Sequence, residues 1–176
     1  MILYFLRHAS AGEHFANPKK DEKRGLDKEG IEQCGYIGRA LAALDVQVDV
    51  IVSSPLKRCT QTAALVGNEL GYEGKLQLDT GLRPEAGLAD FRRLLEKYSR
   101  MEAVMVIGHN PNLSQFLGAI ISDSGCEASL ELKKGAVAKV EMRRTSGTLQ
   151  WCMTPKVLRV LYDAAIESSR PKTSRK

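Results

Sequence analysis

The sequence predicts an α/β fold, a three-layer domain with a mostly parallel central sheet and helices on both faces. Short apolar runs alternate along the chain with segments whose apolar residues recur every three or four positions. The first pattern is typical of strands covered on both faces, and the second is typical of amphipathic helices. A length of 176 residues, with 43% hydrophobic and 27% charged residues, fits one globular domain. Strands that alternate with helices favour a parallel sheet.

The first half of the chain contains two strand–helix units. Ile2–Leu6 is a continuous apolar run and predicts a buried strand. A helix with Asp27 as its cap is expected to run to about Leu44, and Val48–Val52 predicts the second strand. Ser54 and Pro55 then predict the cap and the first-turn proline of the next helix.

The second half continues the alternation and ends in a pair of strands. Thr145-Ser146-Gly147 is expected to join that pair, which would add an antiparallel edge to the sheet. The expected elements are, in order, a short strand at Lys75–Leu78, a helix at Leu88–Tyr98, a strand at Ala103–Ile107, a helix from Leu113 to Ile121, strands at Ala136–Met142 and Thr148–Met153, and a helix from Pro155 to about Glu167.

The basic charge of the chain is concentrated at its end. The formal net charge is 26 − 21 = +5, but residues 168–176 carry four basic residues and no acid, so the rest has 22 − 21 = +1. We therefore predict a single domain over residues 1–167 and a flexible basic tail over 168–176. A near-neutral body with 6% aromatic residues offers little footprint for nucleic acid, and no nucleic-acid partner is expected.

Cysteine usage and hydropathy predict a cytoplasmic protein. The four cysteines are scattered, form no C-x-x-C pair and match no zinc pattern, so they are expected to be reduced thiols. No apolar run approaches the roughly 20 residues of a membrane helix, which excludes a membrane span. Met1–Leu6 has no basic stretch before it and is too short for a secretory signal.

Histidines and arginines stand where the predicted strands end. Arg7 and His8 follow the first strand, Arg58 lies one turn into the helix after the second, and His109 and Asn110 follow the Ala103–Ile107 strand. Ligands of open α/β sheets bind at the carboxyl ends of the strands. The sequence therefore predicts a site that gathers two histidines and two arginines at one edge.

This set of side chains suits phosphoryl transfer. Arginine offers planar bidentate donors that match phosphate oxygens, and two arginines can neutralise a phosphate dianion. A neutral imidazole is a competent nucleophile, and a second histidine can donate to another phosphate oxygen. We expect a phosphate or sulfate ion to bind in this pocket.

Three segments resemble the signatures of the histidine phosphatase superfamily, also called the phosphoglycerate mutase-like superfamily. They are LRHASAG (Leu6–Gly12), SSPLKRCTQTA (Ser53–Ala63) and VIGHNPNLS (Val106–Ser114), in the order of the family. The short length and GLDKEG (Gly25–Gly30) are most similar to the SixA-type phosphohistidine phosphatases. The resemblance covers roughly Met1 to Thr154.

The resemblance implies a role for each matching residue. His8 would be the nucleophile and become phosphorylated, and Arg7, Arg58 and His109 would form the phosphate pocket. Asn110 is a further candidate for binding phosphate. No metal and no organic cofactor would be needed. The implied substrate is phosphohistidine on a protein, with a small phosphate ester as the alternative.

Two positions depart from the family pattern. Ala9 stands where the family has glycine, so the turn must accept a Cβ. The general acid is the second departure, and Glu85 in GLRPEAG is the candidate. An alkoxide leaving group needs a proton donor, whereas the imidazole of phosphohistidine can leave after protonation by solvent. The acid is therefore optional for phosphohistidine.

Other readings of the same residues stay open at the level of sequence. A metal-dependent hydrolase would use His8, His109 and a carboxylate such as Asp123, and a non-enzymatic module would only bind phosphorylated partners or nucleic acid. Cys59 is expected to be a small residue that packs in the core. A redox switch stays open as the alternative, because nearby arginines would favour the thiolate. His14 is expected to lie in a polar loop outside the site. The mixed-charge run Lys19–Arg24 is expected to be a solvated loop, with a place at the rim of the pocket as the alternative.

Overall fold

The computed structural model describes residues 1–122 and 128–169, with side chains described through residue 164. One six-stranded sheet has the strand order β3-β2-β4-β1-β5-β6. The elements are β1 (Ile2–Arg7), α1 (Pro18–Glu22), α2 (Lys28–Ala43), β2 (Val50–Ser53), α3 (Lys57–Glu69), β3 (Gln77–Leu78), a 3₁₀ turn (Thr80–Leu82), α4 (Leu88–Lys97), β4 (Ala103–Gly108), α5 (Asn112–Ile121), β5 (Val137–Met142), β6 (Gly147–Met153) and α6 (Pro155–Ser169).

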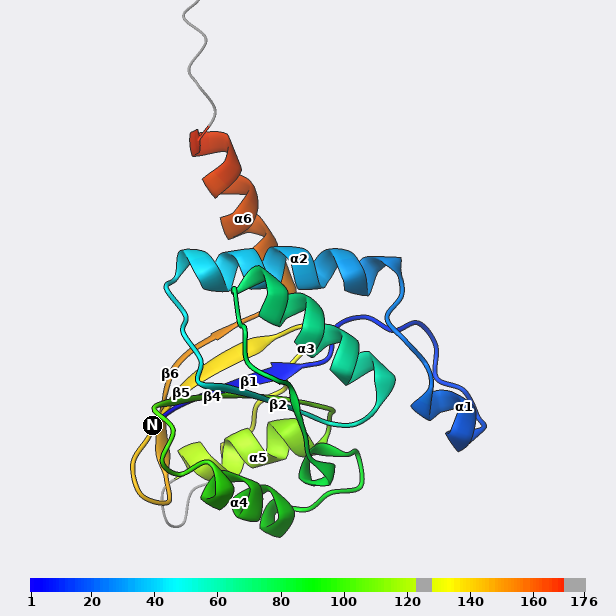
Figure 1. Cartoon of the computed structure of the whole chain (residues 1–176), viewed down its shortest axis with the longest axis vertical. Helices are drawn as coiled ribbons and strands as arrows, with labels where there is room; N and C mark the ends of the chain where they lie inside the picture. The colour runs from blue at the N-terminus through cyan, green and yellow to red at the C-terminus, as the bar shows by residue number, and fades with distance from the viewer. Residues whose placement is uncertain (123–127, 170–176) are drawn as a thin grey trace, which may run out of the picture.

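The sheet confirms the predicted α/β class. Strands β3, β2, β4 and β1 are parallel, and β5 and β6 add an antiparallel edge. Helices α2 and α3 cover one face with α6 beyond them, while α4 and α5 cover the other (Figure 1). Side chains of β1 alternate between the two cores: Leu3 and Phe5 pack with α4 and α5, and Tyr4 and Leu6 pack with α2 and α3. Because β1 is covered on both faces, it is apolar from Ile2 to Leu6 and becomes polar only at its last residue, Arg7.

The start of α2 is confirmed, and the start predicted for α3 is wrong. Asp27 caps α2 by accepting a hydrogen bond from the amide of Gly30. Helix α3, however, begins at Lys57 after Leu56, which gives no side-chain cap. Ser54 continues the strand direction instead, because its amide donates to Ile107 O. Its hydroxyl lies 2.9 Å from His109 Nε2, so this serine serves the site and not the helix.

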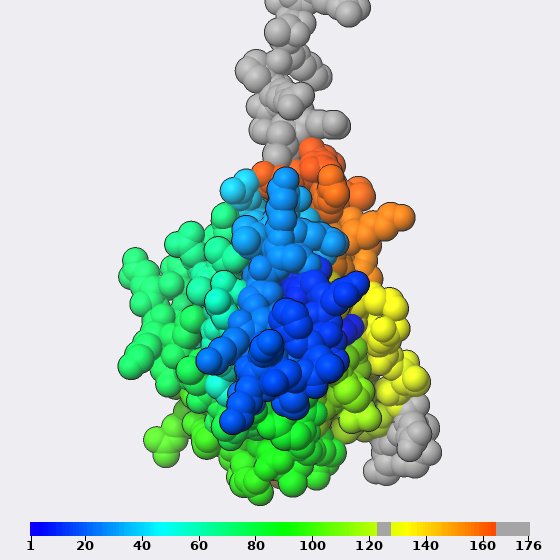
Figure 2. Space-filling view, turned by 90° about the vertical axis from the view of Figure 1, so that its right-hand side faces the viewer, coloured from blue at the N-terminus to red at the C-terminus, as the bar shows by residue number. Residues whose placement is uncertain are grey.

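Helix α1 was not predicted. The run Lys19–Arg24 was expected to be a solvated loop, but Pro18–Glu22 forms a short helix with Asp21 buried beneath it. Asn17 caps this helix, and Pro18 stands in its first turn. Figure 2 looks at the molecule from the side of α1, and the dark blue N-terminal residues cover the middle of that face.

The last described element is α6, which continues to Ser169. Residues 170–176 of the predicted basic tail lie outside the described residues, as do Asp123 and Cys126. Within residues 1–122 and 128–169, no helix is long and apolar enough to cross a membrane.

Candidate active site

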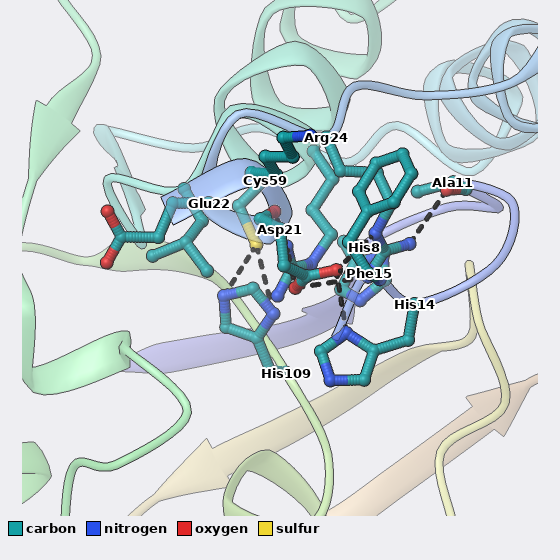
Figure 3. A network of polar contacts seen from close by, with 12 residues as sticks. His8, Ala11, His14, Phe15, Asp21, Glu22, Arg24, Cys59 and His109 are labelled. Atoms are coloured by element: carbon teal, nitrogen blue, oxygen red, sulfur yellow. Dashed lines mark hydrogen bonds and ion pairs between the residues drawn. The ribbon is translucent and has the colours of Figure 1, made fainter. Parts of the chain in front are cut away.

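Parallel strands bring the two histidines together. Strands β1 and β4 are neighbours in register, with Arg7 opposite Gly108, so the residues that follow them share one edge of the sheet. The rings of His8 and His109 lie 5.1 Å apart between centroids and are inclined by 58°. Both side chains are buried (Figure 3).

The contacts of His8 define its tautomer. Nδ1 lies 2.8 Å from Ala9 O, and because a carbonyl oxygen only accepts, Nδ1 carries the proton. Nε2 is left with a free lone pair. Burial, together with the charges of Arg58 and Arg7, lowers the pKa of His8 to about 3. The imidazole is therefore neutral and nucleophilic at neutral pH.

Two arginines, Arg58 buried and Arg7 half-buried, are each held through Nη1. Arg7 Nη1 donates to Leu132 O at 2.8 Å. Arg58 Nη1 donates to Asp21 O at 3.0 Å and to Asp21 Oδ2 at 3.2 Å. In both arginines Nε is buried and has no hydrogen-bond partner among the described residues. A buried donor without a partner costs about 1–3 kcal/mol, so two such donors indicate a place for an anion.

His109 is also a neutral imidazole. Its Nε2 lies 2.9 Å from Ser54 Oγ and 3.3 Å from Cys59 Sγ. Burial, followed by the neighbouring His8 and Arg58, lowers the pKa of His109 to about 2. In neutral form it can donate one hydrogen bond to an oxygen in the pocket.

At Cys59, burial outweighs the arginine charge that would favour a thiolate. The side chain is fully buried, and burial raises the pKa of the Cys59 thiol strongly despite the charge of Arg58. A buried thiol with a raised pKa is unreactive, so Cys59 acts in packing beside His109.

A carboxylate shapes the loop that follows His8. Asp27 Oδ2 accepts from Ser10 Oγ at 2.7 Å and from the amide of Gly12 at 2.6 Å, while Oδ1 caps α2. A Cβ on Gly30 would stand 1.9 Å from Ser10 O. These contacts explain two residues of the GLDKEG segment. Asp27 holds the loop after His8 by hydrogen bonds, and Gly30 has no Cβ that would overlap that loop.

Ala9 fits the turn without strain. Among the described residues other than glycine, only Asp45 has a positive φ, so Ala9 keeps an ordinary backbone conformation. Its amide donates to Thr62 Oγ1 at 3.2 Å, and this hydroxyl in turn donates to Arg58 O at 2.7 Å. The threonine of the second signature therefore joins the nucleophile loop to α3.

Sequence reasoning missed Asp21 and Arg24. Asp21 is buried, and its carboxylate contacts Arg58, Arg24 Nε at 2.7 Å, His14 Nδ1 at 2.7 Å and the amide of Phe15 at 3.1 Å (Figure 3). His14 thus touches this network, contrary to expectation. The signal that could have revealed the segment is Asn17-Pro18, a helix-start pair.

Among the described residues, Glu85 makes no hydrogen bond or ion pair with His8, His109, Arg7 or Arg58; its partner is Arg83. Its side chain is 66% exposed and is paired with Arg83, which also binds Glu22. Burial by itself would raise the pKa of Glu85, but the hydrogen bond from Arg83, a backbone hydrogen bond and the charge of Arg83 together hold it below its ordinary value. Glu85 is therefore ionised at neutral pH in this arrangement.

Asn110 lies beside Arg7 but is engaged with the protein. Its Nδ2 donates to Leu132 O at 2.9 Å, and its Oδ1 accepts from Ser114 Oγ at 2.9 Å. One amide hydrogen stays available for a ligand. Within the described part of the chain, no group of three or more His, Cys, Asp or Glu side chains could hold a metal ion. Asp123, the carboxylate of the metal-site reading, lies outside that part.

A cavity of about 750 Å³ opens beside Arg7, between α5 and residues 128–131. Its lining is mostly uncharged and includes Asn110, Ser114 and Gln115, with Glu131 as its acid. The cavity therefore offers room for a larger group next to the guanidinium group of Arg7.

Comparison with known proteins gives consistent matches. The model of the histidine phosphatase superfamily (branch 1) matches residues 3–103, more than half of the chain, including Arg7, His8 and Arg58 but not His109. An uncharacterized protein of Picosynechococcus is 32% identical over 123 residues, which are 68% of this chain and 73% of that protein.

Two solved structures share the fold. A protein histidine phosphatase SixA complexed with tungstate has a TM-score of 0.79 and 23% identity, over 89% of this chain and 98% of its own. The alpha-ribazole phosphatase from Shigella flexneri has a TM-score of 0.67 and 15% identity, over 88% and 97%.

Proposed function

The chain belongs to the histidine phosphatase superfamily, and from this premise we propose that it hydrolyses phosphohistidine on another protein, with His8 as the nucleophile. The observation that carries the proposal is a neutral, buried His8 beside two arginines whose buried Nε groups have no partner among the described residues. Each part supplies what in-line phosphoryl transfer needs, a lone pair and fixed positive charge.

The proposed reaction has two steps. His8 Nε2 attacks phosphorus and forms a P–N bond while the bond to the leaving nitrogen or oxygen breaks. Arg7, Arg58 and His109 hold the oxygens of the transferring group. Water then attacks phospho-His8, releases inorganic phosphate and restores the imidazole. The proton on Nδ1 stays on the hydrogen bond to Ala9 O and keeps the ring oriented in both steps.

Three features support phosphohistidine as the substrate. Glu85 is exposed and paired with Arg83, which makes it a weak proton donor, and phosphohistidine is the substrate that needs a donor least. The cavity beside Arg7 offers room for a side chain carried on a protein. The SixA structure of the same fold carries tungstate, a tetrahedral analogue of phosphate.

The second candidate is a small phosphate ester at the same site. The shared fold with the Shigella alpha-ribazole phosphatase supports it. In this case the leaving group would be an alkoxide, and a proton donor would be required. The two candidates therefore differ in their dependence on Glu85.

A paired assay tests the proposal. Wild type and His8→Ala are given a phosphohistidine peptide and an aryl phosphate, without added metal and with a chelator. We expect wild type to release phosphate and to prefer the peptide, while His8→Ala loses activity by a factor of about 10³ or more.

The other outcomes are equally informative. A preference for the aryl phosphate selects the ester candidate. Equal activity of His8→Ala, or no turnover of either substrate by wild type, rejects the catalytic proposal. In that event binding of a phosphohistidine peptide without turnover would indicate a binding module.

A further inference from the structure

Asp21 is a buried acid next to a site built for an anion. Its carboxylate is 10% exposed and bonds to two arginines, Arg58 and Arg24 (Figure 3). Burial by itself would raise the pKa of Asp21, but the hydrogen bonds from Arg24, His14 and the amide of Phe15 hold it well below its usual range. A permanent negative charge here repels phosphate, so its presence needs an explanation beyond charge balance.

We propose that Asp21 is a positioning residue that holds Arg58 by one side of its guanidinium group, so that the opposite side stays turned to the phosphate. The inference rests on the proposed function. It assigns a role in phosphoryl transfer to a short helix, α1, that lies outside the three signature segments.

The geometry of the guanidinium group carries the argument. Arg58 Nη1 has two hydrogens, and both have acceptors on one residue, Asp21 O at 3.0 Å and Asp21 Oδ2 at 3.2 Å. Nε and Nη2 form the opposite edge, which is the fork that binds two oxygens of a phosphate in parallel. Nε is buried and without a partner in the described residues. Holding Nη1 thus leaves the bidentate edge free and fixes its direction.

The same carboxylate connects Arg58 to the loop of the nucleophile. Asp21 Oδ1 accepts from Arg24 Nε at 2.7 Å, and Arg24 Nη1 donates to Ala11 O at 2.7 Å. Ala11 is three residues after His8. Asp21 therefore stands between the arginine of α3 and the loop of the nucleophile, and it can keep the two in register.

A counter-charge and a positioning residue make opposite predictions. If Asp21 only balanced charge, then Asp21→Asn would make the pocket more positive and bind anions more tightly. If Asp21 orients Arg58, the same variant no longer fixes the Nε and Nη2 donors of Arg58, and both anion binding and catalysis weaken. Asparagine matches aspartate in shape, so the variant removes the charge with little change in packing.

The test measures tungstate affinity by calorimetry and kcat/KM with a phosphohistidine peptide. We expect Asp21→Asn to weaken tungstate binding about fivefold or more and to lower kcat/KM about tenfold or more. Glu22→Gln is the matched control, because Glu22 is the next residue of α1 and pairs with Arg83; it should change both quantities by less than about twofold. Asp21→Ser is a second variant, and thermal unfolding shows that each variant folds.

A double-mutant cycle tests whether Asp21 acts through Arg58. Arg58→Lys keeps the positive charge but lacks the planar pair of donors that Asp21 would orient. In the Arg58→Lys background, Asp21→Asn should therefore change tungstate affinity by less than about twofold. Additive effects of the two substitutions would overturn the proposal. Tighter tungstate binding by Asp21→Asn would also overturn it and would leave Asp21 as a counter-charge.

Failure of the proposed function has a different signature. If wild type binds tungstate but hydrolyses neither a phosphohistidine peptide nor an aryl phosphate, the phosphatase proposal fails. The cycle on tungstate affinity still decides whether Asp21 positions Arg58, because it requires no turnover.

Discussion

At the scale of residues, the candidate site buries histidines and arginines, which are costly to remove from water, and holds them by hydrogen bonds. His8 and His109 are both neutral in the folded protein because burial lowers the pKa of each. In the unfolded chain a histidine takes up a proton near pH 6.5. The same desolvation that keeps a nucleophile unprotonated therefore makes the fold sensitive to acid.

Acid should destabilise the protein well before its carboxylates titrate. As pH falls below about 6.5, the unfolded chain binds protons at both histidines while the folded protein does not, so stability is lost. Each histidine contributes up to about 1.4 kcal/mol per pH unit. Urea unfolding between pH 7 and pH 5, in buffers without phosphate, measures this slope. His109→Gln should reduce it by about half, and a flat profile in wild type would contradict the argument.

Glu85 allows a second prediction at this scale. The carboxylate is paired with Arg83, and its pKa lies below the ordinary value. Glu85→Gln should therefore change hydrolysis of a phosphohistidine peptide by less than about threefold, with a larger loss for a phosphate ester that needs a proton donor. Steady-state kinetics with both substrates give the comparison. Equal losses on the two substrates would show that Glu85 does not protonate the leaving group.

The sequence predicts those site residues whose positions follow from the ends of parallel strands. It does not predict those whose positions depend on local packing. Arg7, His8 and His109 follow apolar runs, and parallel strands end at one edge, so their meeting follows from topology. Asp21 stands in a run of mixed charge, where a solvated acid and a buried acid look alike. Ser54 has the pattern of a helix cap, and only the position of His109 shows that its hydroxyl is used elsewhere.

At the scale of elements, α2 is fitted against the loop of the nucleophile. Asp27 caps the helix and also ties the loop, so the helix and the site form together. Gly30, in the first turn, makes the close approach. Glycine inside a helix costs about 1 kcal/mol relative to alanine, and in this position the contact with the loop offsets that cost.

Two glycines of α2 should respond to alanine in opposite directions. A Cβ on Gly30 would overlap the backbone oxygen of Ser10 at 1.9 Å, whereas a Cβ on Gly35 would meet no atom within 4 Å. We expect Gly30→Ala to destabilise the fold by about 2 kcal/mol or more and to lower kcat/KM, because the loop after His8 must move. Gly35→Ala should stabilise it by up to about 1 kcal/mol with unchanged activity. Thermal and urea unfolding measure the stability of both variants. Equal changes in stability would show that α2 and the loop after His8 are not in tight contact.

At the scale of the whole molecule, the candidate site and helix α6 lie on different parts of the fold. The site is at the ends of β1 and β4, whereas α6 packs against α2, with Leu158 fully buried in that core. Figure 1 shows α6 leading away from the sheet on the far side of α2. In the proposed site the positive charge near His8 is that of Arg7, Arg58 and Arg24.

Removal of the basic end separates catalysis from general anion binding. A chain that stops at Glu167 has a net charge of 22 − 21 = +1 instead of +5. We expect its kcat/KM for a phosphohistidine peptide to stay within about twofold of wild type, because Arg7, Arg58 and Arg24 supply the positive charge of the proposed site. Any salt-sensitive binding to nucleic acid should be lost, since it depends on clustered Lys and Arg. Steady-state kinetics measure kcat/KM, and a filter-binding titration at two salt concentrations measures binding to nucleic acid.

A large loss of activity, or a lowered midpoint of thermal unfolding, would mean that residues 168–176 take part in the folded domain. The domain boundary proposed at residue 167 would then be wrong.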